Sequence, residues 1–120
     1  MNKNYLIVPI ELLDHLKNNE LLILSQIAYL KKSFNTITAS NDFFASKLNL
    51  SVPTVSRAIR TLERFNYITI HYDFKEKNKT KRIILLTEKS LTIYGLHHTK
   101  IAKKTLKTKK TKVLEQFLKD

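Results

Sequence analysis

The chain has 120 residues and a formal net charge of +12, from 22 lysines and arginines against 10 aspartates and glutamates. A positive field of this size favours a polyanionic partner, either nucleic acid or an anionic membrane surface. The absence of cysteine excludes disulfides, thiolate metal sites and cysteine nucleophiles. The sequence has no signal-like N-terminus and no apolar run near the roughly 18 residues of a membrane span, so we expect a protein of the cytoplasm or nucleoid.

Glycine is almost missing from the sequence, with Gly95 the only one. The phosphate-cradling loops of nucleotide-binding enzymes need glycines, because their backbone N–H groups must approach the ligand closely. Such a loop is excluded in its usual form. Positions that need a positive φ should fall to asparagine, and Asn49, Asn66 and Asn78 each lie where we expect a turn.

The N-terminal part of the sequence predicts two helices. The first is short, covers about residues 8–16 and has Pro9 in its first turn. Its buried side should consist of Leu12, Leu13 and Leu16. The second is capped by Asn18 or Asn19 and covers about residues 20–32, with apolar side chains nearly all round. We therefore expect it to be the central helix of the core.

The next segment predicts a short strand, a short helix and a tight turn. Residues 36–39 are rich in β-branched side chains, which indicates a small edge strand. Ser40 and Asp42 precede apolar residues that suggest a capped helix of about two turns. Residues 49–51 would then form the turn between two helices.

The helix after this turn has one apolar face. Ser51 is placed as its N-cap, and Pro53 lies in its first turn. Its apolar residues recur at intervals of three, four and three: Val52, Val55, Ile59 and Leu62. The remaining sides carry polar residues, mainly Thr54, Arg57, Arg60, Thr61 and Arg64.

Two interpretations of the polar side stay open. Were this helix to lie in a major groove, Thr54, Ser56 and Arg57 would be placed to contact base edges. Arg60 and Arg64 would then lie near the flanking phosphates, and Ser51 would lie at the start of the interface. The alternative is an ordinary amphipathic surface helix with solvated arginines, because helix-turn-helix patterns are short and occur by chance.

The sequence downstream favours the first interpretation. Residues 67–72 and 81–86 predict two strands joined by a lysine-rich connection, which makes a hairpin directly after the arginine-bearing helix. Such a wing would contact the DNA backbone or enter the minor groove. Its lysines would otherwise serve solubility and edge protection. The candidate contacts in this hairpin are Lys75, Lys77, Asn78, Lys79, Lys81 and Arg82.

The C-terminal segment has a different composition. Residues 97–120 contain eight lysines and two acidic residues, which is half of the net charge. Sparse apolar residues suggest a helix with a thin stripe, ending in the cluster Val113, Leu114, Phe117 and Leu118. The segment could lie along DNA, pair with its counterpart in a dimer, or stay disordered until bound. The terminal apolar cluster favours dimerisation combined with DNA contact.

The order of these elements resembles the winged helix-turn-helix superfamily, and residues 50–68 look like its recognition-helix signature. Similar strings occur in bacterial transcription regulators and in the N-terminal domains of plasmid and phage replication initiators from low-GC Gram-positive bacteria. The start at residues 8–13 is similar to those replication domains, and the resemblance covers roughly residues 8–86. One departure is Asn66, where the family usually has glycine; asparagine can adopt the same turn.

The resemblance implies a mainly α fold with a small β-hairpin (α+β). A winged helix-turn-helix DNA-binding domain would cover residues 1–90, and a basic, helical extension would cover residues 91–120. The implied function is sequence-specific binding of double-stranded DNA by a homodimer. The protein would act as a transcription regulator, or as an accessory factor at a plasmid or phage origin of replication or conjugative transfer.

Two other classes of function remain. A winged helix can instead be a protein-interaction module, here within a replication or relaxosome complex. The third class is a nuclease or another enzyme that acts on nucleic acid. The adjacent His97 and His98 cannot share a metal in the helical i, i+4 manner, and no nucleophile turn is present. We therefore expect no enzyme activity, no metal site and no cofactor.

Overall fold

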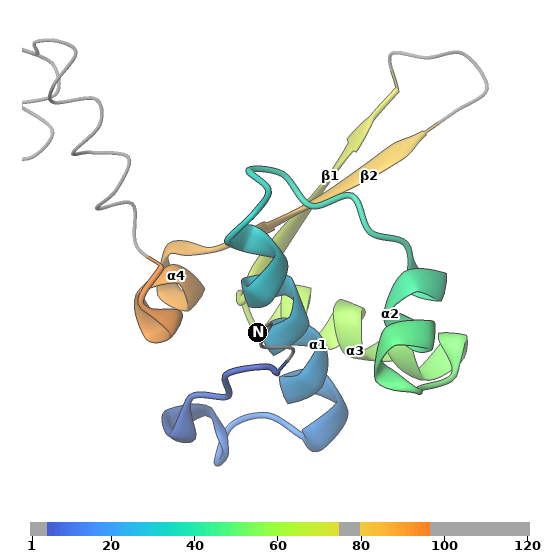
Figure 1. Ribbon diagram of the computed structural model, residues 1–120. Helices are drawn as coiled ribbons and strands as arrows, with labels where there is room; N and C mark the ends of the chain where they lie inside the picture. Colours follow the sequence, from blue (N-terminus) through green and yellow to red (C-terminus); the bar gives the residue numbers. More distant parts are fainter. Residues whose placement is uncertain (1–4, 75–79, 97–120) are drawn as a thin grey trace, which may run out of the picture.

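The computed structural model describes residues 5–74 and 80–96. Within these ranges, five helical elements and two strands follow one another. They are η1 (Ile10–Leu12), α1 (Asn18–Lys31), α2 (Asn41–Leu48), α3 (Val52–Arg64), β1 (Ile68–Asp73), β2 (Lys81–Leu86) and α4 (Glu88–Tyr94). Figure 1 shows the hairpin of β1 and β2 projecting away from the helical body. Helices α2 and α4 lie on opposite sides of this helical body.

Helix α1 is the centre of the core, as its apolar pattern predicts. Buried residues occupy it on almost every side: Leu21, Ile23, Leu24, Ser25, Gln26, Ile27 and Ala28. Its start differs from the prediction, because the N-cap is Lys17 and not Asn18 or Asn19. The Glu20 carboxylate reaches back and accepts a hydrogen bond of 2.9 Å from the backbone N–H of Lys17. This bond satisfies an N-terminal donor without a capping asparagine.

The N-terminal segment packs on the core through fewer residues than we predicted. Leu12 and Leu16 are buried, whereas Leu13 is 56% exposed, so its predicted burial is wrong. The regular helix here is limited to the 3₁₀ turn η1. A 3₁₀ turn has about three residues per turn, so neighbouring side chains point about 120° apart and only one of them faces the core.

The strand predicted over residues 36–39 is reduced to a single bridge. The carbonyl of Ile37 accepts a hydrogen bond of 2.8 Å from the backbone N–H of Ile84, which joins this segment to β2. Two residues further on, the carbonyl of Ala39 accepts a bond of 2.7 Å from the guanidinium of Arg82. A side chain therefore occupies the carbonyl where a strand would continue its backbone ladder.

Helices α2 and α3 form the predicted helix-turn-helix, and local signals define both. The Ser40 hydroxyl caps α2 by accepting from the backbone N–H of Phe43 at 3.1 Å. Asn49 ends α2 with a φ of 58°, and Asn66 lies between α3 and β1 with a φ of 65°. The prediction that these two asparagines take a positive φ is confirmed; Asn78 lies outside the described residues.

Strands β1 and β2 form the predicted hairpin as an antiparallel pair. Ile68 lies opposite Leu86, and Ile70 lies opposite Ile84, at the end of the hairpin nearest the helices. Ile68, Ile84 and Leu86 are buried. The base of the hairpin is therefore part of the hydrophobic core, while its far end extends beyond it.

Helix α4 overlaps the helical extension predicted over residues 91–120 but begins earlier, at Glu88, where its capping signals are present. The Thr87 hydroxyl accepts from the backbone N–H of Ser90 at 3.3 Å, and Gly95 ends the helix with a φ of 70°. The buried Ser90 hydroxyl donates to the carbonyl of Tyr67 at 2.7 Å, which fixes α4 to the start of β1. The predicted domain limit at residue 90 falls inside α4, whose side chains pack on the core at Leu91, Ile93 and Tyr94.

Candidate nucleic-acid interface

Helix α3 has a buried face and an exposed face rich in arginine. Four side chains are packed in the core: Val55, Ala58, Ile59 and Leu62. Arg57, Arg60 and Arg64 are exposed and follow one another at intervals of three and four residues. At about 3.6 residues per turn this spacing places the three arginines in a row, opposite the buried face.

Val52 departs from the predicted apolar face. It is 40% exposed, and Ala58 takes its place as the fourth buried residue. Val52 is the first residue of α3, about 60° around the helix from Val55, which puts it at the margin of the buried face. Val52 is therefore not part of the buried face. The intervals of three and four residues predict which side chains share a face of the helix, but not how far the neighbouring elements cover that face.

Ser51 and Thr54 bind each other at the start of α3. The Ser51 hydroxyl accepts a bond of 3.2 Å from the backbone N–H of Thr54 and donates one of 2.8 Å to the Thr54 hydroxyl. The single donor of Ser51 is thus engaged within the protein. Thr54 keeps its own hydroxyl hydrogen for another acceptor, such as a base edge or a phosphate oxygen.

The exposed arginines have different local contacts. The guanidinium of Arg60 donates to the Ser56 hydroxyl at 3.1 Å, one turn earlier on the same helix. The guanidinium of Arg64 lies 5.6 Å from the ring centroid of Phe65, in a cation–π contact at the C-terminal end of α3. These contacts are weak at exposed sites, so both side chains can be redirected to a stronger anionic acceptor.

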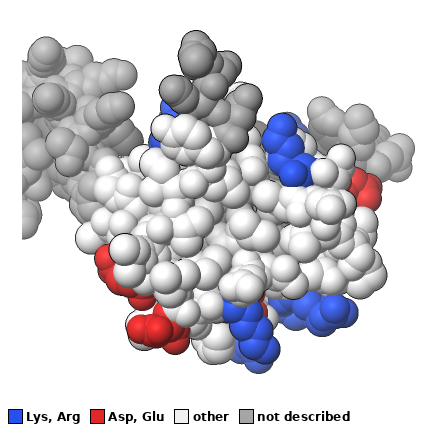
Figure 2. Space-filling view, turned by 60° about the horizontal axis from the view of Figure 1, so that its bottom comes forward, with Lys and Arg blue, Asp and Glu red and all other residues white. Residues whose placement is uncertain are grey.

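Charged residues do not cover the surface evenly. Figure 2 views the molecule from below the orientation of Figure 1, and the middle of this face has almost no charged residues. Lysines and arginines lie in separate groups towards its edges, and acidic residues lie elsewhere on the rim. On the face shown, residues of both charges therefore lie around an uncharged centre.

Among the predicted wing contacts, Lys81 and Arg82 lie in the described part of the chain. Lys81 is exposed at the far end of β2, opposite Asp73. Arg82 is half-buried and donates to the Asn41 side-chain oxygen at 2.8 Å and to the carbonyl of Ala39 at 2.7 Å. Burial lowers the pKa of the Arg82 guanidinium, and these two bonds offset part of its lost hydration.

Arg82, which the sequence suggested as a DNA contact, also has an internal structural role. Its guanidinium connects the hairpin to the N-terminal end of α2, so the structure shows it holding the wing in place. Lys75, Lys77, Asn78 and Lys79, the other predicted contacts of the wing, lie outside the described residues.

Two aromatic residues of the wing, Tyr72 and Phe74, are not among the contacts that the sequence predicts. Tyr72 and Phe74 are 55% and 70% exposed, and their ring centroids lie 6.3 Å apart. The available signal was their spacing of two residues, which places both side chains on one face of a strand. The strand predicted over residues 67–72 contained Tyr72, and Phe74 continues the same spacing beyond its end.

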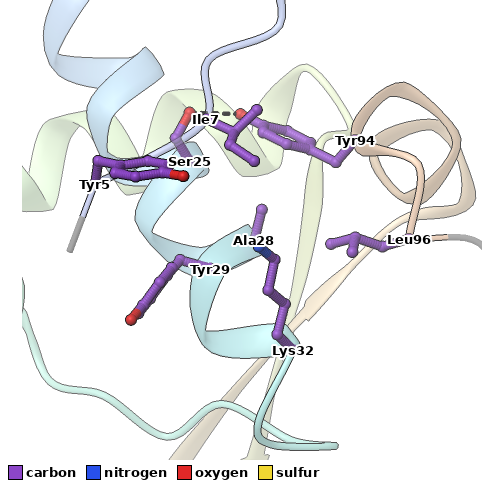
Figure 3. Close-up of a pocket in the computed structure, with 8 residues that line it drawn as sticks. All are labelled: Tyr5, Ile7, Ser25, Ala28, Tyr29, Lys32, Tyr94 and Leu96. Atoms are coloured by element: carbon purple, nitrogen blue, oxygen red, sulfur yellow. Dashed lines mark hydrogen bonds between the residues drawn. The ribbon is translucent and has the colours of Figure 1, made fainter. Parts of the chain in front are cut away.

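A second feature is a hollow between α1, the N-terminal segment and the end of α4 (Figure 3). It is lined by Tyr5, Ile7, Ser25, Ala28, Tyr29, Lys32, Tyr94 and Leu96. The Ser25 and Tyr94 hydroxyls form a hydrogen bond of 2.8 Å. Burial is the main cause that raises the pKa of Tyr94 to about 12, and the bond to Ser25 partly opposes it. This hollow lies where the two ends of the described chain meet.

Metal-holding groups and membrane-spanning helices were sought in the part of the chain that the structure describes. Within residues 5–74 and 80–96, no three His, Asp or Glu side chains are grouped so that they could hold a metal ion. None of the helices in these ranges is both long enough and apolar enough to cross a bilayer.

Comparison with known proteins agrees with this geometry. A family model described as a helix-turn-helix domain matches residues 14–68, which hold α1, α2 and α3. The structure is similar to that of Staphylococcus aureus MarR in complex with salicylate and kanamycin, with a TM-score of 0.52 and 18% identity. That match covers 92% of this chain and 71% of that chain. No curated protein matches the chain significantly. The predicted winged helix-turn-helix fold, with its mainly α (α+β) composition, is confirmed.

Proposed function

We propose that this winged helix-turn-helix protein binds double-stranded DNA in a sequence-specific manner, with α3 in the major groove. The observation that carries the proposal is the row of Arg57, Arg60 and Arg64 on the exposed face of α3. The opposite face is buried, so the helix is held firmly while its arginines remain accessible. An α-helix fits the major groove, and arginine binds both guanine edges and phosphates.

The position of each residue along α3 gives it a role. Arg57 lies in the N-terminal half of the helix, the half that contacts base edges in helix-turn-helix proteins, together with Thr54 and Ser56. Arg60 and Arg64 lie further along and would bind flanking phosphates. Ser51 supports this arrangement from the helix start, since its hydroxyl already bonds Thr54.

The wing would add contacts that do not depend on sequence. Lys81 is exposed on β2, and the lysines at positions 75, 77 and 79 follow one another in the connection between the strands. Each lysine that neutralises a phosphate releases condensed counterions, so affinity should fall steeply with added salt.

For the biological role, we propose a transcription regulator or an accessory factor at a plasmid or phage origin of replication or transfer. A homodimer in the cytoplasm, associated with nucleoid or plasmid DNA, fits this role. Two-fold symmetric operators are bound by dimers. The support for a dimer is the apolar cluster at the end of the sequence, together with the exposed Tyr5, Ile7, Ile10 and Leu13 of the N-terminal segment.

The same exposed apolar residues support a second candidate, a module that docks on a protein of a replication or relaxosome complex. Exposed apolar residues gathered in one segment are typical of protein interfaces. The two candidates differ in their response to salt. DNA binding weakens steeply as salt rises, whereas an apolar protein interface depends on salt only slightly.

The test is selection of binding sites from a randomised duplex library with the full chain, followed by affinity measurements at several salt concentrations. We expect an enriched sequence and a linear fall of log affinity with log salt. Arg57→Ala should reduce the preference for the selected site over random DNA by about 1–3 kcal/mol.

Lys17→Ala is the matched control, because it removes a positive charge at the start of α1 while the cap uses only the backbone of Lys17. It should leave the preference unchanged. Equal losses on selected and random DNA for Arg57→Ala would show that another surface reads the sequence. Failure to bind any duplex at low salt would refute the proposed function.

A further inference from the structure

The far end of the wing carries an exposed aromatic pair. Tyr72 and Phe74 are 55% and 70% exposed, their ring centroids are 6.3 Å apart, and their planes are inclined by 35°. Aromatic rings bury large apolar areas when they are covered, so leaving two of them in water forgoes a large stabilisation. A pair in mutual contact at the end of a projecting hairpin is therefore a candidate for burial against a partner.

The register of the hairpin shows why the core does not cover this pair. Side chains alternate across a strand, so Ile68, Ile70 and Tyr72 lie on one face of β1, and Phe74 follows at the same spacing. The two isoleucines lie opposite Leu86 and Ile84 at the base of the hairpin. Tyr72 lies opposite Arg82, beyond the last buried pair. The apolar face of the hairpin thus continues outward past the point where the helices end (Figure 1).

The hairpin is held firmly just below the pair. Arg82, the cross-strand neighbour of Tyr72, donates to Asn41 at 2.8 Å and to the carbonyl of Ala39 at 2.7 Å. These bonds join the hairpin to the segment that leads into α2. The aromatic pair therefore projects from an anchored support, which lowers the entropy cost of placing it against a partner.

The net charge of the protein favours a nucleic acid as the partner. Lys81 is exposed on β2, on the face of the hairpin opposite to the pair, and the whole chain has a net charge of +12. The minor groove of DNA fits such a pair, because it is narrow and deep, phosphates line its edges, and stacked bases form its apolar interior. Apolar side chains inserted between base steps there unstack them and kink the duplex by roughly 20–90°.

We propose that Tyr72 and Phe74 form an apolar wedge with which the wing enters the minor groove and bends the duplex. This inference rests on the proposed function, since it assigns to the wing a mode of contact with the same DNA. The wedge would widen the interface of α3 by bringing flanking DNA onto the protein, which compensates for the lost stacking.

The experiment measures DNA bending by energy transfer between dyes at the two ends of a selected duplex of about 30 base pairs. The full chain should shorten the end-to-end distance. The double variant Tyr72→Ser with Phe74→Ser should bind about tenfold more weakly, which corresponds to about 1.4 kcal/mol, and should leave the duplex straight. The variant Tyr72→Leu with Phe74→Leu should still bend the duplex, because leucine also serves as a wedge.

Phe34→Ser is the control, because Phe34 is an aromatic residue of similar exposure, 56%, that lies outside the wing. It should change neither affinity nor bending. Because all three aromatic residues are exposed, thermal unfolding should be nearly unchanged in each variant and should exclude loss of the fold as the cause.

Three results would overturn the inference. A serine variant that bends the duplex as well as the wild type would show that the pair is not the wedge. A leucine variant as defective as the serine variant would point to stacking on unpaired bases instead. A wild-type chain that binds without bending would also exclude a wedge while leaving the proposed function intact, whereas a chain that binds no duplex would refute both.

Discussion

At the scale of single residues, short hydrogen bonds to the backbone determine where the helices of the interface begin. Ser51 accepts from the backbone N–H of Thr54 at 3.2 Å, and Ser40 does the same for Phe43 at 3.1 Å. Each cap satisfies one of the donors that the first turn of a helix leaves unpaired. The cap of α3 matters most for function, because it fixes the end of the helix that carries Thr54 and Arg57.

Ser51→Ala should lower the free energy of unfolding by about 1 kcal/mol, since alanine leaves the Thr54 donor without its cap. Urea denaturation followed by circular dichroism measures this loss. Ser51→Asp should restore most of it, because aspartate also caps well. Ser46→Ala, an exposed serine inside α2, is the control and should be neutral or slightly stabilising. An unchanged midpoint for Ser51→Ala would show that the cap contributes nothing.

At the scale of elements, side chains join the wing and α4 to the rest of the molecule. Arg82 connects β2 to Asn41 and Ala39 at the start of α2. The carbonyl of Tyr67 at the start of β1 accepts from Ser90 at 2.7 Å, and the hydroxyls of Ser25 and Tyr94 join α1 to α4 at 2.8 Å. The orientation of the wing relative to α3 depends on these few polar contacts as well as on the apolar core.

A double-mutant cycle should detect the contact between Arg82 and Asn41. The single variants Arg82→Ala and Asn41→Ala should each destabilise the protein, and the pair should show a coupling of about 1 kcal/mol, because one hydrogen bond is common to both. Lys81 with Asn41 is the control cycle and should show no coupling. Additive effects of Arg82 and Asn41 would show that the bond does not stabilise the wing.

Arg82 and Lys81 should also differ in their effect on DNA binding. Lys81→Ala should reduce the slope of log affinity against log salt by about 0.9, the amount for one phosphate contact. Arg82→Ala should weaken binding with a smaller change of slope, because its guanidinium is engaged within the protein. If Arg82→Ala also reduced the slope by about 0.9, the Arg82 guanidinium would be assigned to a phosphate contact.

Burial of the Tyr94 phenol should make stability depend on alkaline pH. The pKa of Tyr94 is raised from its ordinary value of 10.0 to about 12 in the folded protein, so the folded state holds the phenol proton more tightly than the unfolded state. Its contribution to stability is full below pH 10 and is lost as pH rises towards 12. Lysines titrate in the same range, so the measurement is the difference in unfolding free energy between the wild type and Tyr94→Phe. This difference should change between pH 10 and pH 12, and a constant difference would contradict the assignment.

At the scale of the whole molecule, the N-terminal segment and the end of α4 meet in one hollow beside α1 (Figure 3). Tyr5 and Ile7 line it from the start of the described chain, and Tyr94 and Leu96 line it from the end. The helix-turn-helix and the wing are formed by the residues between them. The charge of the sequence is also unevenly distributed, since residues 97–120 hold half of the net charge of +12.

A chain that ends after Leu96 should therefore bind DNA more weakly and with a smaller salt slope, because it loses eight lysines. Sedimentation should show a lower oligomeric state, since the apolar cluster at positions 113–118 is also removed. The melting temperature provides the control for folding of the remaining domain. An unchanged slope and an unchanged sedimentation coefficient would exclude both roles proposed for the segment.

Most of the local structure of α3 and the hairpin could be predicted from the sequence, because its signals are local. The cap at Ser51, the positive φ of Asn49 and Asn66, and the arginine row of α3 each depend on residues within about one helical turn of one another. The same holds for the alternation that gives β1 and β2. Interactions of this range are determined by backbone geometry and side-chain chemistry, whatever the rest of the chain does.

Other features were decided only when distant segments came together. Leu13 and Val52 fit apolar patterns, but no neighbouring element covers them. Arg82 fits the pattern of a surface cation, but Ala39 before α2 and Asn41 at the start of α2 accept hydrogen bonds from its guanidinium.

The sequence by itself thus determined α1, α2, α3 and the hairpin, and which helix presents arginines. The tertiary structure decided which apolar residues are buried, which cation is bound internally, and that an aromatic pair stays exposed at the end of the wing. The reason is that burial and hydrogen-bond partners across the fold depend on segments far apart in the chain, and a local pattern contains no information about those segments.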